Sequence, residues 1–356
     1  MHKAGVLATL LLSYVVGISS WQQCVKLQPW NHRAQTRRRS QVDFVFRMLC
    51  GDVINVEAMW PALAGKKTCA NSAAGRVIRE AWAHEECSHH KANQEKQERD
   101  WTISRQMVEY KDGEMALQGL YARPQGKGLR KKLPGVILAH TAVGPQEDFI
   151  LWKLDSLAVA GYAAFALDMF GTGRALWDRS ESLAARRVIT EDRSLMQSRA
   201  SAALRTLAGL PGVDPDNIAA VGYCFGGMVV LDLARMGAPP GLRAVASLHG
   251  ILVPTHTGAG RDLSLEQTAI APRVLVLHAS KDPFVPPEQV RAMEEEFARR
   301  RAKLEVVKYG GNARHAFTRP EKIAPADREA GLSYDEEADA DSWRRVLDML
   351  RQELKQ

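Results

Sequence analysis

Short apolar runs alternate with amphipathic segments over the second two-thirds of the chain. The runs lie at residues 135–139, 162–168, 218–223, 244–248, 274–278 and 304–309, and helix-like segments fill the gaps between them. Strands that are apolar almost throughout are buried on both faces, which is typical of a parallel sheet covered by helices. The pattern therefore predicts an α/β fold with a mainly parallel sheet and helices on both faces.

Two further predicted elements lie before and after this alternation of strands and helices. Residues 106–110 and 115–121 alternate as strands do, and the Asp112-Gly113 turn between them predicts a β-hairpin. At the other end, residues 335–354 place large apolar side chains on one helical stripe, namely Trp343, Val346, Leu347, Leu350 and Leu354. We therefore expect one domain over residues 103–356.

The first hundred residues do not show this alternation of strand-like and helix-like segments. Residues 4–18 form an apolar run of about 15 residues, short for a membrane span, which needs about 20. Lys3 precedes the run, small residues follow it, and an acid-poor tract rich in arginine comes next. This predicts a targeting segment over residues 1–42, for the secretory route or organelle import. The alternative is an uncleaved membrane anchor at residues 4–18.

Residues 43–102 lack a sustained apolar period and end in a strongly charged run, which predicts a poorly ordered extension or linker. Four of the five cysteines lie in the first hundred residues, at positions 24, 50, 69 and 87. Cys87 lies near three histidines at positions 84, 89 and 90, but the spacing matches no common zinc site. We predict no metal and no disulfide framework.

The excess of basic over acidic residues is concentrated at the N-terminus. The whole chain has 48 Lys and Arg against 41 Asp and Glu, and residues 1–100 hold 14 of the former and 9 of the latter. The remainder is therefore nearly neutral, with 34 against 32, and no basic stripe is interleaved with aromatic residues. We expect no nucleic-acid partner, and no stable membrane contact from residues 103–356.

The strongest chemical signal is Cys224. A run of β-branched and small residues ends just before it, Gly222 and Gly226 flank it at two residues' distance, and a helix-like segment follows from Met228. This is typical of a nucleophile elbow, a sharp strand-to-helix turn in which the helix N-terminus stabilises a thiolate. The alternative is a buried structural cysteine.

A thiol nucleophile needs a base and a group that orients the base. Asp282 follows the strand at residues 274–278, and His315 follows the next strand. Both loops lie at the carboxyl edge of a parallel sheet, where ligands bind. The chain order Cys224, Asp282, His315 is that of the α/β-hydrolase fold, so these three residues are the predicted catalytic triad.

Other residues compete for these roles. Three other histidines are rivals of His315 as the base, namely His249, His256 and His278. We expect structural roles for two of these, because His278 belongs to an apolar strand and His249 ends another. Asp168 also ends a strand and is the second choice for the orienting acid. For the oxyanion hole we predict the backbone N–H groups of Phe225 and of Ala142 in the loop after residues 135–139.

These residues lie in motifs that resemble the dienelactone hydrolase family of α/β-hydrolases. The resemblance covers about residues 105–355 and rests on four stretches: Gly222-Tyr223-Cys224-Phe225-Gly226-Gly227, Gly161-Tyr162-Ala163-Ala164-Phe165-Ala166-Leu167-Asp168-Met169-Phe170-Gly171, Asp282-Pro283-Phe284-Val285-Pro286 and His315-Ala316-Phe317. It implies a hydrolase without a cofactor that cleaves lactones or small carboxylic esters through an acyl-thiol intermediate. A monomer is expected.

The chain departs from the family at one position. The family commonly carries a glutamate after the early strand, and this chain has Thr141 there, which we list with the substrate-binding candidates. Arg319 matches one of the arginines that hold the substrate carboxylate in the family, and Arg174 lies only near the place of the other. Two alternatives stay open: a small-molecule-binding protein without catalysis, and a thioesterase or peptidase with the same triad.

Overall fold

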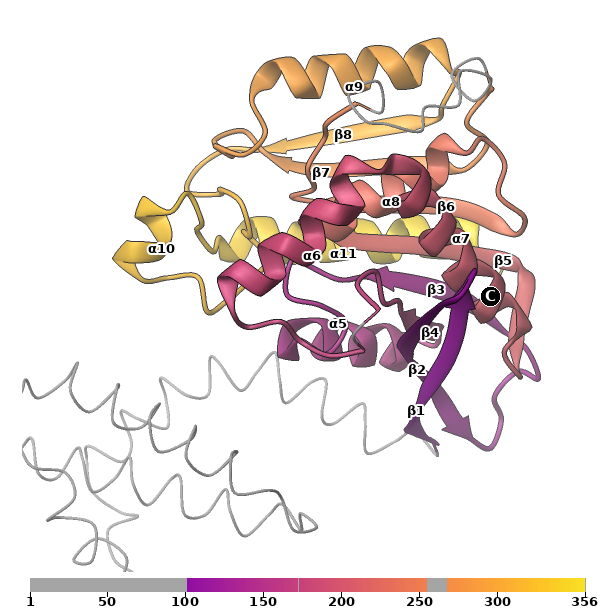
Figure 1. The fold of residues 1–356 in the computed structure, drawn as a ribbon. Coiled ribbons are helices and arrows are strands. Elements are labelled where there is room, and N and C mark those ends of the chain that lie inside the picture. The colour runs from indigo at the N-terminus through magenta and orange to yellow at the C-terminus, as the bar shows by residue number, and fades with distance from the viewer. Residues whose placement is uncertain (1–100, 172, 255–267, 356) are drawn as a thin grey trace, which may run out of the picture. The chain divides into compact units, whose positions relative to one another are not determined.

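The computed structural model describes residues 101–171, 173–254 and 268–355, which form an eight-stranded sheet with helices on both faces (Figure 1). The predictions for residues 1–42, for most of 43–102, for the four N-terminal cysteines and for His256 lie outside these ranges. The domain boundary at residue 103 stays a prediction as well. Within the described residues, no helix is both long enough and apolar enough to cross a membrane.

The strand order in the sheet is β1-β2-β4-β3-β5-β6-β7-β8. The strands are β1 (Trp101–Asp112), β2 (Met115–Gly126), β3 (Leu133–Ala139), β4 (Ala163–Ala166), β5 (Val213–Tyr223), β6 (Leu242–Leu248), β7 (Arg273–Ala279) and β8 (Leu304–Tyr309). From β4 to β8 along this order all neighbours are parallel, whereas β2 is antiparallel to both β1 and β4. The predicted mainly parallel α/β fold is confirmed.

The helices are α5 (Asp148–Val159), α6 (Arg179–Glu191), α7 (Arg193–Gly209), α8 (Phe225–Arg235), α9 (Pro287–Arg299), α10 (Pro325–Glu329) and α11 (Glu336–Glu353). Buried side chains of α7, α8 and α9 pack on one face of the sheet. Those of α5 and α11 pack on the other face. Two apolar cores thus hold the strands, and the carboxyl ends of β3, β5, β6, β7 and β8 meet at one edge.

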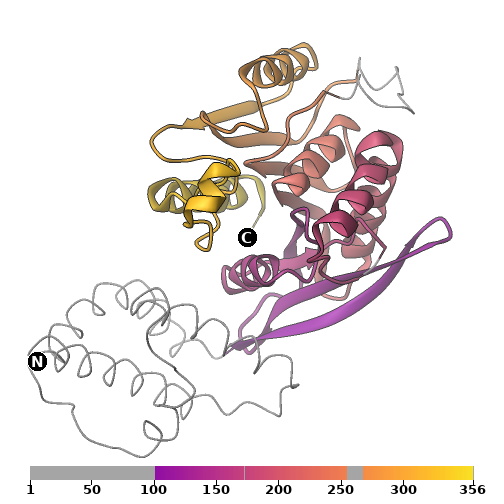
Figure 2. The same ribbon diagram turned by 60° about the vertical axis from the view of Figure 1, so that its left-hand side comes forward.

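The hairpin forms as predicted but is longer on both sides, since β1 and β2 pair along their whole length and turn at Gly113 (φ +58°). Figure 2 shows the two strands as one long ribbon at the edge of the sheet. The hairpin extends beyond the residues that alternate between apolar and polar, because the charged and polar residues near its ends still form backbone hydrogen bonds. The Asp112-Gly113 turn fixes the register.

Several strand boundaries differ from the sequence prediction, and contacts in the structure explain two of these differences. β4 ends at Ala166 rather than at Asp168, because the Asp168 carboxylate accepts backbone hydrogen bonds from the following loop and turns the chain out of the sheet. β5 begins at Val213 rather than at residue 218, because Val213 already pairs with Leu133 of β3. The register between β3 and β5 then shifts next to Gly135. The first difference arises within the loop that follows β4, and the second from pairing with β3, which is distant in sequence.

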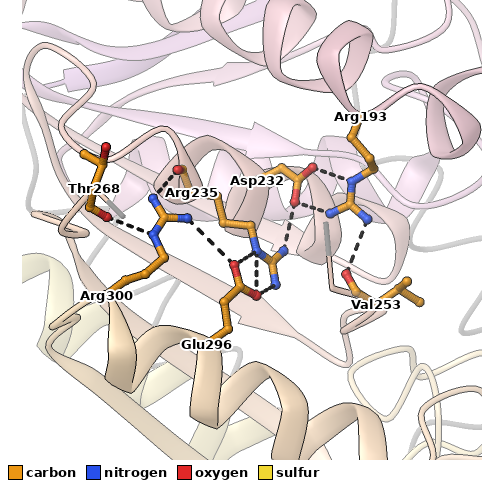
Figure 3. Close-up of polar contacts among 7 residues, drawn as sticks. All are labelled: Arg193, Asp232, Arg235, Val253, Thr268, Glu296 and Arg300. Atoms are coloured by element: carbon orange, nitrogen blue, oxygen red, sulfur yellow. Dashed lines mark hydrogen bonds and ion pairs between the residues drawn. The ribbon is translucent and has the colours of Figure 1, made fainter. Parts of the chain in front are cut away.

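Five charged side chains form a buried network among α7, α8 and α9 (Figure 3). Asp232 accepts hydrogen bonds from Arg193 and Arg235, and Glu296 accepts from Arg235 at 2.8–3.1 Å. Arg300 lies 3.7 Å from Glu296. Arg193 also donates to the carbonyl of Val253 and Arg300 to that of Thr268. The network therefore fastens α8 to its neighbouring helices at the end away from Cys224.

Candidate active site

Cys224 occupies a sharp turn between β5 and α8. Its backbone has φ 57° and ψ −117°, a left-handed conformation that L-residues rarely adopt. A Cβ atom on Gly222 would lie 2.0 Å from the carbonyl oxygen of Gly226, and one on Gly226 would lie 2.2 Å from that of Ala139. Both positions therefore require glycine, and the local sequence folds as a nucleophile elbow.

The structure brings Cys224, His315 and Asp282 together in series. The Nε2 atom of His315 lies 3.0 Å from the Sγ atom of Cys224. On the other side of the ring, Nδ1–H donates to Oδ2 of Asp282 at 2.8 Å. The second oxygen of Asp282 accepts from the backbone N–H of Phe284 at 2.9 Å, so the carboxylate is held at both ends. Base and acid are both buried.

The same contacts shift the pKa values of Cys224 and His315. Burial alone would raise the pKa of the Cys224 thiol, but the charge and hydrogen bond of His315 outweigh it and hold the pKa below the ordinary value of 9.0. Burial opposes the imidazolium of His315, but the charge of Cys224 and the hydrogen bond that the ring donates to Asp282 raise its pKa to about 10. Each of the two groups therefore favours the charged form of the other.

The two predicted oxyanion donors belong to the turn after β5 and to the loop after β3. The backbone N–H of Phe225 hydrogen-bonds to the Cys224 sulfur and helps to lower the pKa of the thiol. Ala142 lies in the loop after β3, where Ser182 of α6 donates to its carbonyl at 2.6 Å. Within the described ranges the N–H of Ala142 has no hydrogen-bond partner. These two N–H groups are the candidates for holding an oxyanion.

Sequence reasoning missed a buried carboxylate beside Thr141. The Thr141 hydroxyl donates to Glu147, which precedes α5, and Glu147 also pairs with Arg319. Burial raises the pKa of Glu147, against the opposing effects of Arg319 and Thr141. The sequence offered only an acidic pair, Glu147 and Asp148, that is typical of a helix N-terminus. The structure thus places a carboxylate against Thr141, in the loop between β3 and α5.

The two predicted substrate arginines differ in their surroundings. Arg319 is largely buried and lies between the carboxylates of Glu147 and Glu321. Arg174 pairs with Glu181, and 57% of its side chain is exposed. The structure thus joins Arg319 to Thr141 through Glu147, whereas the contacts of Arg174 lead to the surface of α6.

Arg186 is a second residue that sequence reasoning missed. It shares a face of α6 with Ser182, which binds the Ala142 loop, and with Ile189, which is buried in the core. Its positive charge lowers the pKa of Cys224, although burial is the largest effect on that thiol and acts in the opposite direction. Arg186 is half-buried and has no ion-pair partner among the described residues. Only the helical spacing from Ser182 could have indicated it.

The rivals named from the sequence take other positions. The Asp168 carboxylate accepts hydrogen bonds from the backbone N–H groups of Gln118, Phe170, Gly171 and Gly173, so it holds the loop after β4. His278 is buried on β7 and His249 at the end of β6. Within the described residues, no group of three or more His, Cys, Asp and Glu side chains is arranged to hold a metal ion.

A parallel sheet with a nucleophile elbow after β5, an acid after β7 and a histidine after β8 defines an α/β-hydrolase. The chain belongs to the dienelactone hydrolase family, whose model matches residues 117–354. An uncharacterized protein of Caenorhabditis elegans is 36% identical over 167 residues, 46% of this chain and 98% of that protein. A putative carboxymethylenebutenolidase of Synechocystis is 27% identical over 147 residues, 41% of this chain and 54% of that protein.

Solved structures agree with this assignment. The dienelactone hydrolase-like promiscuous phosphotriesterase P91, from metagenomic libraries, is 33% identical with a TM-score of 0.63, and the match covers 71% of this chain and 99% of P91. A putative dienelactone hydrolase of Klebsiella pneumoniae has a TM-score of 0.53 at 23% identity, over 70% of this chain and 99% of that protein. The second likeness shows the fold alone.

Proposed function

We propose that this domain hydrolyses a lactone or small carboxylic ester by nucleophilic catalysis through Cys224. The observation that carries the proposal is the series of contacts from the Cys224 sulfur through the His315 ring to the Asp282 carboxylate. Membership of the dienelactone hydrolase family supports a hydrolase, and the Synechocystis relative is described as a carboxymethylenebutenolidase. The substrate class and the roles of the three residues belong to the proposal.

The first half of the reaction forms the acyl-thiol. The Cys224 thiolate adds to the carbonyl carbon, and the electron pair of the C=O bond moves onto oxygen, facing the N–H groups of Phe225 and Ala142. When the tetrahedral intermediate collapses, the bond to the leaving oxygen breaks. His315 Nε2–H gives its proton to that oxygen, so the alcohol leaves neutral, or stays tethered when the substrate is a lactone.

The second half releases the acid. Neutral His315 takes a proton from water at Nε2 while the water oxygen adds to the acyl-thiol carbon. Collapse of this second intermediate breaks the C–S bond, and the carboxylic acid leaves. The thiolate and imidazolium are restored, and Asp282 keeps the ring oriented through both proton transfers.

The positive charge of Arg186, which acts on Cys224, favours an anionic acyl group in the substrate. Arg186 has no carboxylate partner among the described residues, whereas Arg319 already lies between two carboxylates. We therefore assign the first contact with a substrate carboxylate to Arg186. Arg319 contributes to the site through its ion pair with Glu147, which also accepts a hydrogen bond from Thr141. An arginine fork matches the geometry of a carboxylate. Arg174 is the least favoured of the predicted contacts because its described ion pair is with exposed Glu181.

The test compares wild-type protein with Cys224→Ala and Cys224→Ser on a panel of p-nitrophenyl esters, lactones, thioesters, a peptide amide and a phosphotriester. The phosphotriester is included because P91 is described as a promiscuous phosphotriesterase. We expect ester or lactone turnover by wild type, a loss of about 10⁴-fold or more in Cys224→Ala, and a trapped acyl adduct on Cys224 by mass spectrometry. Cys224→Ser separates loss of the nucleophile from loss of volume.

Unchanged turnover in Cys224→Ala contradicts the proposed nucleophile. Binding of panel compounds without turnover of any of them favours the alternative of a binding protein on a hydrolase fold. A clear preference for thioesters or the peptide keeps the triad and replaces the proposed substrate class.

A further inference from the structure

A second buried histidine lies next to the catalytic base. His249 directly follows β6 and has φ +37°, which is uncommon for a residue other than glycine. Its backbone N–H donates to the carbonyl of Leu277, while the N–H of Cys224 donates to the carbonyl of Leu248, one residue earlier. The backbone of His249 is thus fixed between the nucleophile elbow and the strand that leads to Asp282.

The side chain of His249 reaches the loop that carries the base. Its Nε2 atom and the hydroxyl of Thr318 are joined by a hydrogen bond of 2.9 Å, and both residues are fully buried. The His249 ring meets the His315 ring edge to face, with centroids 5.3 Å apart, and meets the Phe317 ring in the same way. One side chain therefore contacts three residues of the segment that holds His315.

The charges around His249 keep its ring neutral. Burial is the main cause of a pKa well below the ordinary value for histidine, and the positive charges of His315, Arg319 and Lys153 act in the same direction. These cations come from the base loop and from α5. A neutral ring at this place packs against the imidazolium of His315 without repelling it.

We propose that His249 is a positioning residue that fastens the His315 loop to the nucleophile elbow through Thr318. Its role in this proposal is to hold His315 rather than to react with substrate. The hydrogen bond and the edge-to-face contact hold Nε2 of His315 at its 3.0 Å distance from Cys224. The inference rests on the proposed function, in which that contact carries the proton transfers, but its main readout needs no substrate.

The experiment measures the rate of iodoacetamide alkylation of Cys224 against pH in His249→Phe, Thr318→Val and the double variant. Alkylation is read at Cys224 by peptide mass spectrometry, because the chain has four other cysteines. We expect each single variant to shift the midpoint of the profile to higher pH, since a displaced His315 no longer lowers the pKa of the thiol. The double variant should shift no further than either single variant, because both remove one hydrogen bond.

Two controls separate positioning from general destabilisation. Thr206→Val removes a hydroxyl of α7 that donates to the Ala202 carbonyl, and it should leave the midpoint unchanged. His249→Gln places an amide where Nε2 lies and should shift the midpoint less than His249→Phe. On a substrate turned over by wild type, we expect about a tenfold loss of kcat in Thr318→Val with KM within twofold.

The inference is overturned if His249→Phe and Thr318→Val both keep the alkylation midpoint of the wild type while they are folded and their thermal transitions are unchanged. A double variant whose shift equals the sum of the two single shifts also overturns it. Absence of turnover by wild type together with the expected midpoint shifts contradicts the proposed function alone and leaves the positioning role standing.

Discussion

The two ends of α8 use buried charge in opposite ways. At its N-terminus, Cys224 and His315 form a pair in which one proton decides whether either group is charged. Near its C-terminus, Asp232 and Arg235 belong to a network whose cations are all arginines (Figure 3). Arginine stays protonated at any ordinary pH. The same helix thus carries a charge pair that titrates at one end and fixed charges at the other.

The difference lies in how completely each group is paired. Arg235 is buried with 1% of its side chain exposed, and its guanidinium donates to both Asp232 and Glu296. Burial disfavours its charge, but those two carboxylates outweigh burial and raise its pKa above the ordinary value. The Cys224 sulfur, in contrast, is paired with His315, which gives up and regains a proton in the proposed reaction. A buried charge that is paired with several opposite charges suits a structural role. A buried group whose charge depends on the proton of one partner suits a catalytic role.

The largest effect on stability is expected at the structural end. Asp232→Ala leaves Arg193 and Arg235 buried without their shared carboxylate, which should cost about 3–5 kcal/mol in the free energy of unfolding. Urea denaturation followed by circular dichroism measures the loss. As the matched control, Asp348→Ala removes a carboxylate that pairs with Arg344 and Arg351 on the exposed surface of α11, which should cost less than about 1 kcal/mol. Equal costs for the two variants contradict the comparison.

A smaller loss is expected at the nucleophile elbow. The Cβ of Gly222→Ala would lie 2.0 Å from the Gly226 carbonyl oxygen, so backbone must move, which should cost about 1–3 kcal/mol and displace Cys224. Gly209→Ala is the control, because a Cβ there meets nothing within 4 Å. Thermal unfolding and the alkylation rate of Cys224 are measured together. A normal alkylation rate in Gly222→Ala is incompatible with the strained elbow described above.

The smallest effect concerns recognition of charge. Arg186→Gln should raise KM about tenfold for an ester with a carboxylate in its acyl group and change it less than twofold for the neutral methyl ester. Arg174→Gln, whose side chain pairs with Glu181, should leave both values within twofold. If Arg174→Gln has the larger effect, the assignment of Arg186 to substrate binding is wrong.

The sequence predicted the elements that follow from local patterns. Apolar strands, the Asp112-Gly113 turn and the elbow glycines each depend on neighbours in the chain, and the fold and family they indicated are confirmed. The order of Cys224, Asp282 and His315 could be read because parallel strands bring successive loops to one edge. The structure places these three side chains in contact.

The parts that sequence could not indicate depend on contacts between distant segments. Glu147 reaches Arg319 across 172 positions, and His249 reaches Thr318 across 69. Neither pair has a spacing that predicts contact. The start of β5 was likewise set by pairing with β3, which is distant in sequence. Thr141 thus looked like the loss of a carboxylate, although a glutamate six residues later lies against it.

The most direct test of the account is the pH profile of Cys224 alkylation by iodoacetamide in wild type and His315→Gln. For wild type we predict a midpoint below the ordinary thiol pKa of 9.0 and a thiolate beside an imidazolium that persists up to about pH 10, where His315 loses its proton. In His315→Gln the midpoint should rise above 9.0, because burial then acts on the thiol without the opposing charge. Identical midpoints in the two proteins would contradict the claim that the buried Cys224–His315 pair sets the charge of the nucleophile.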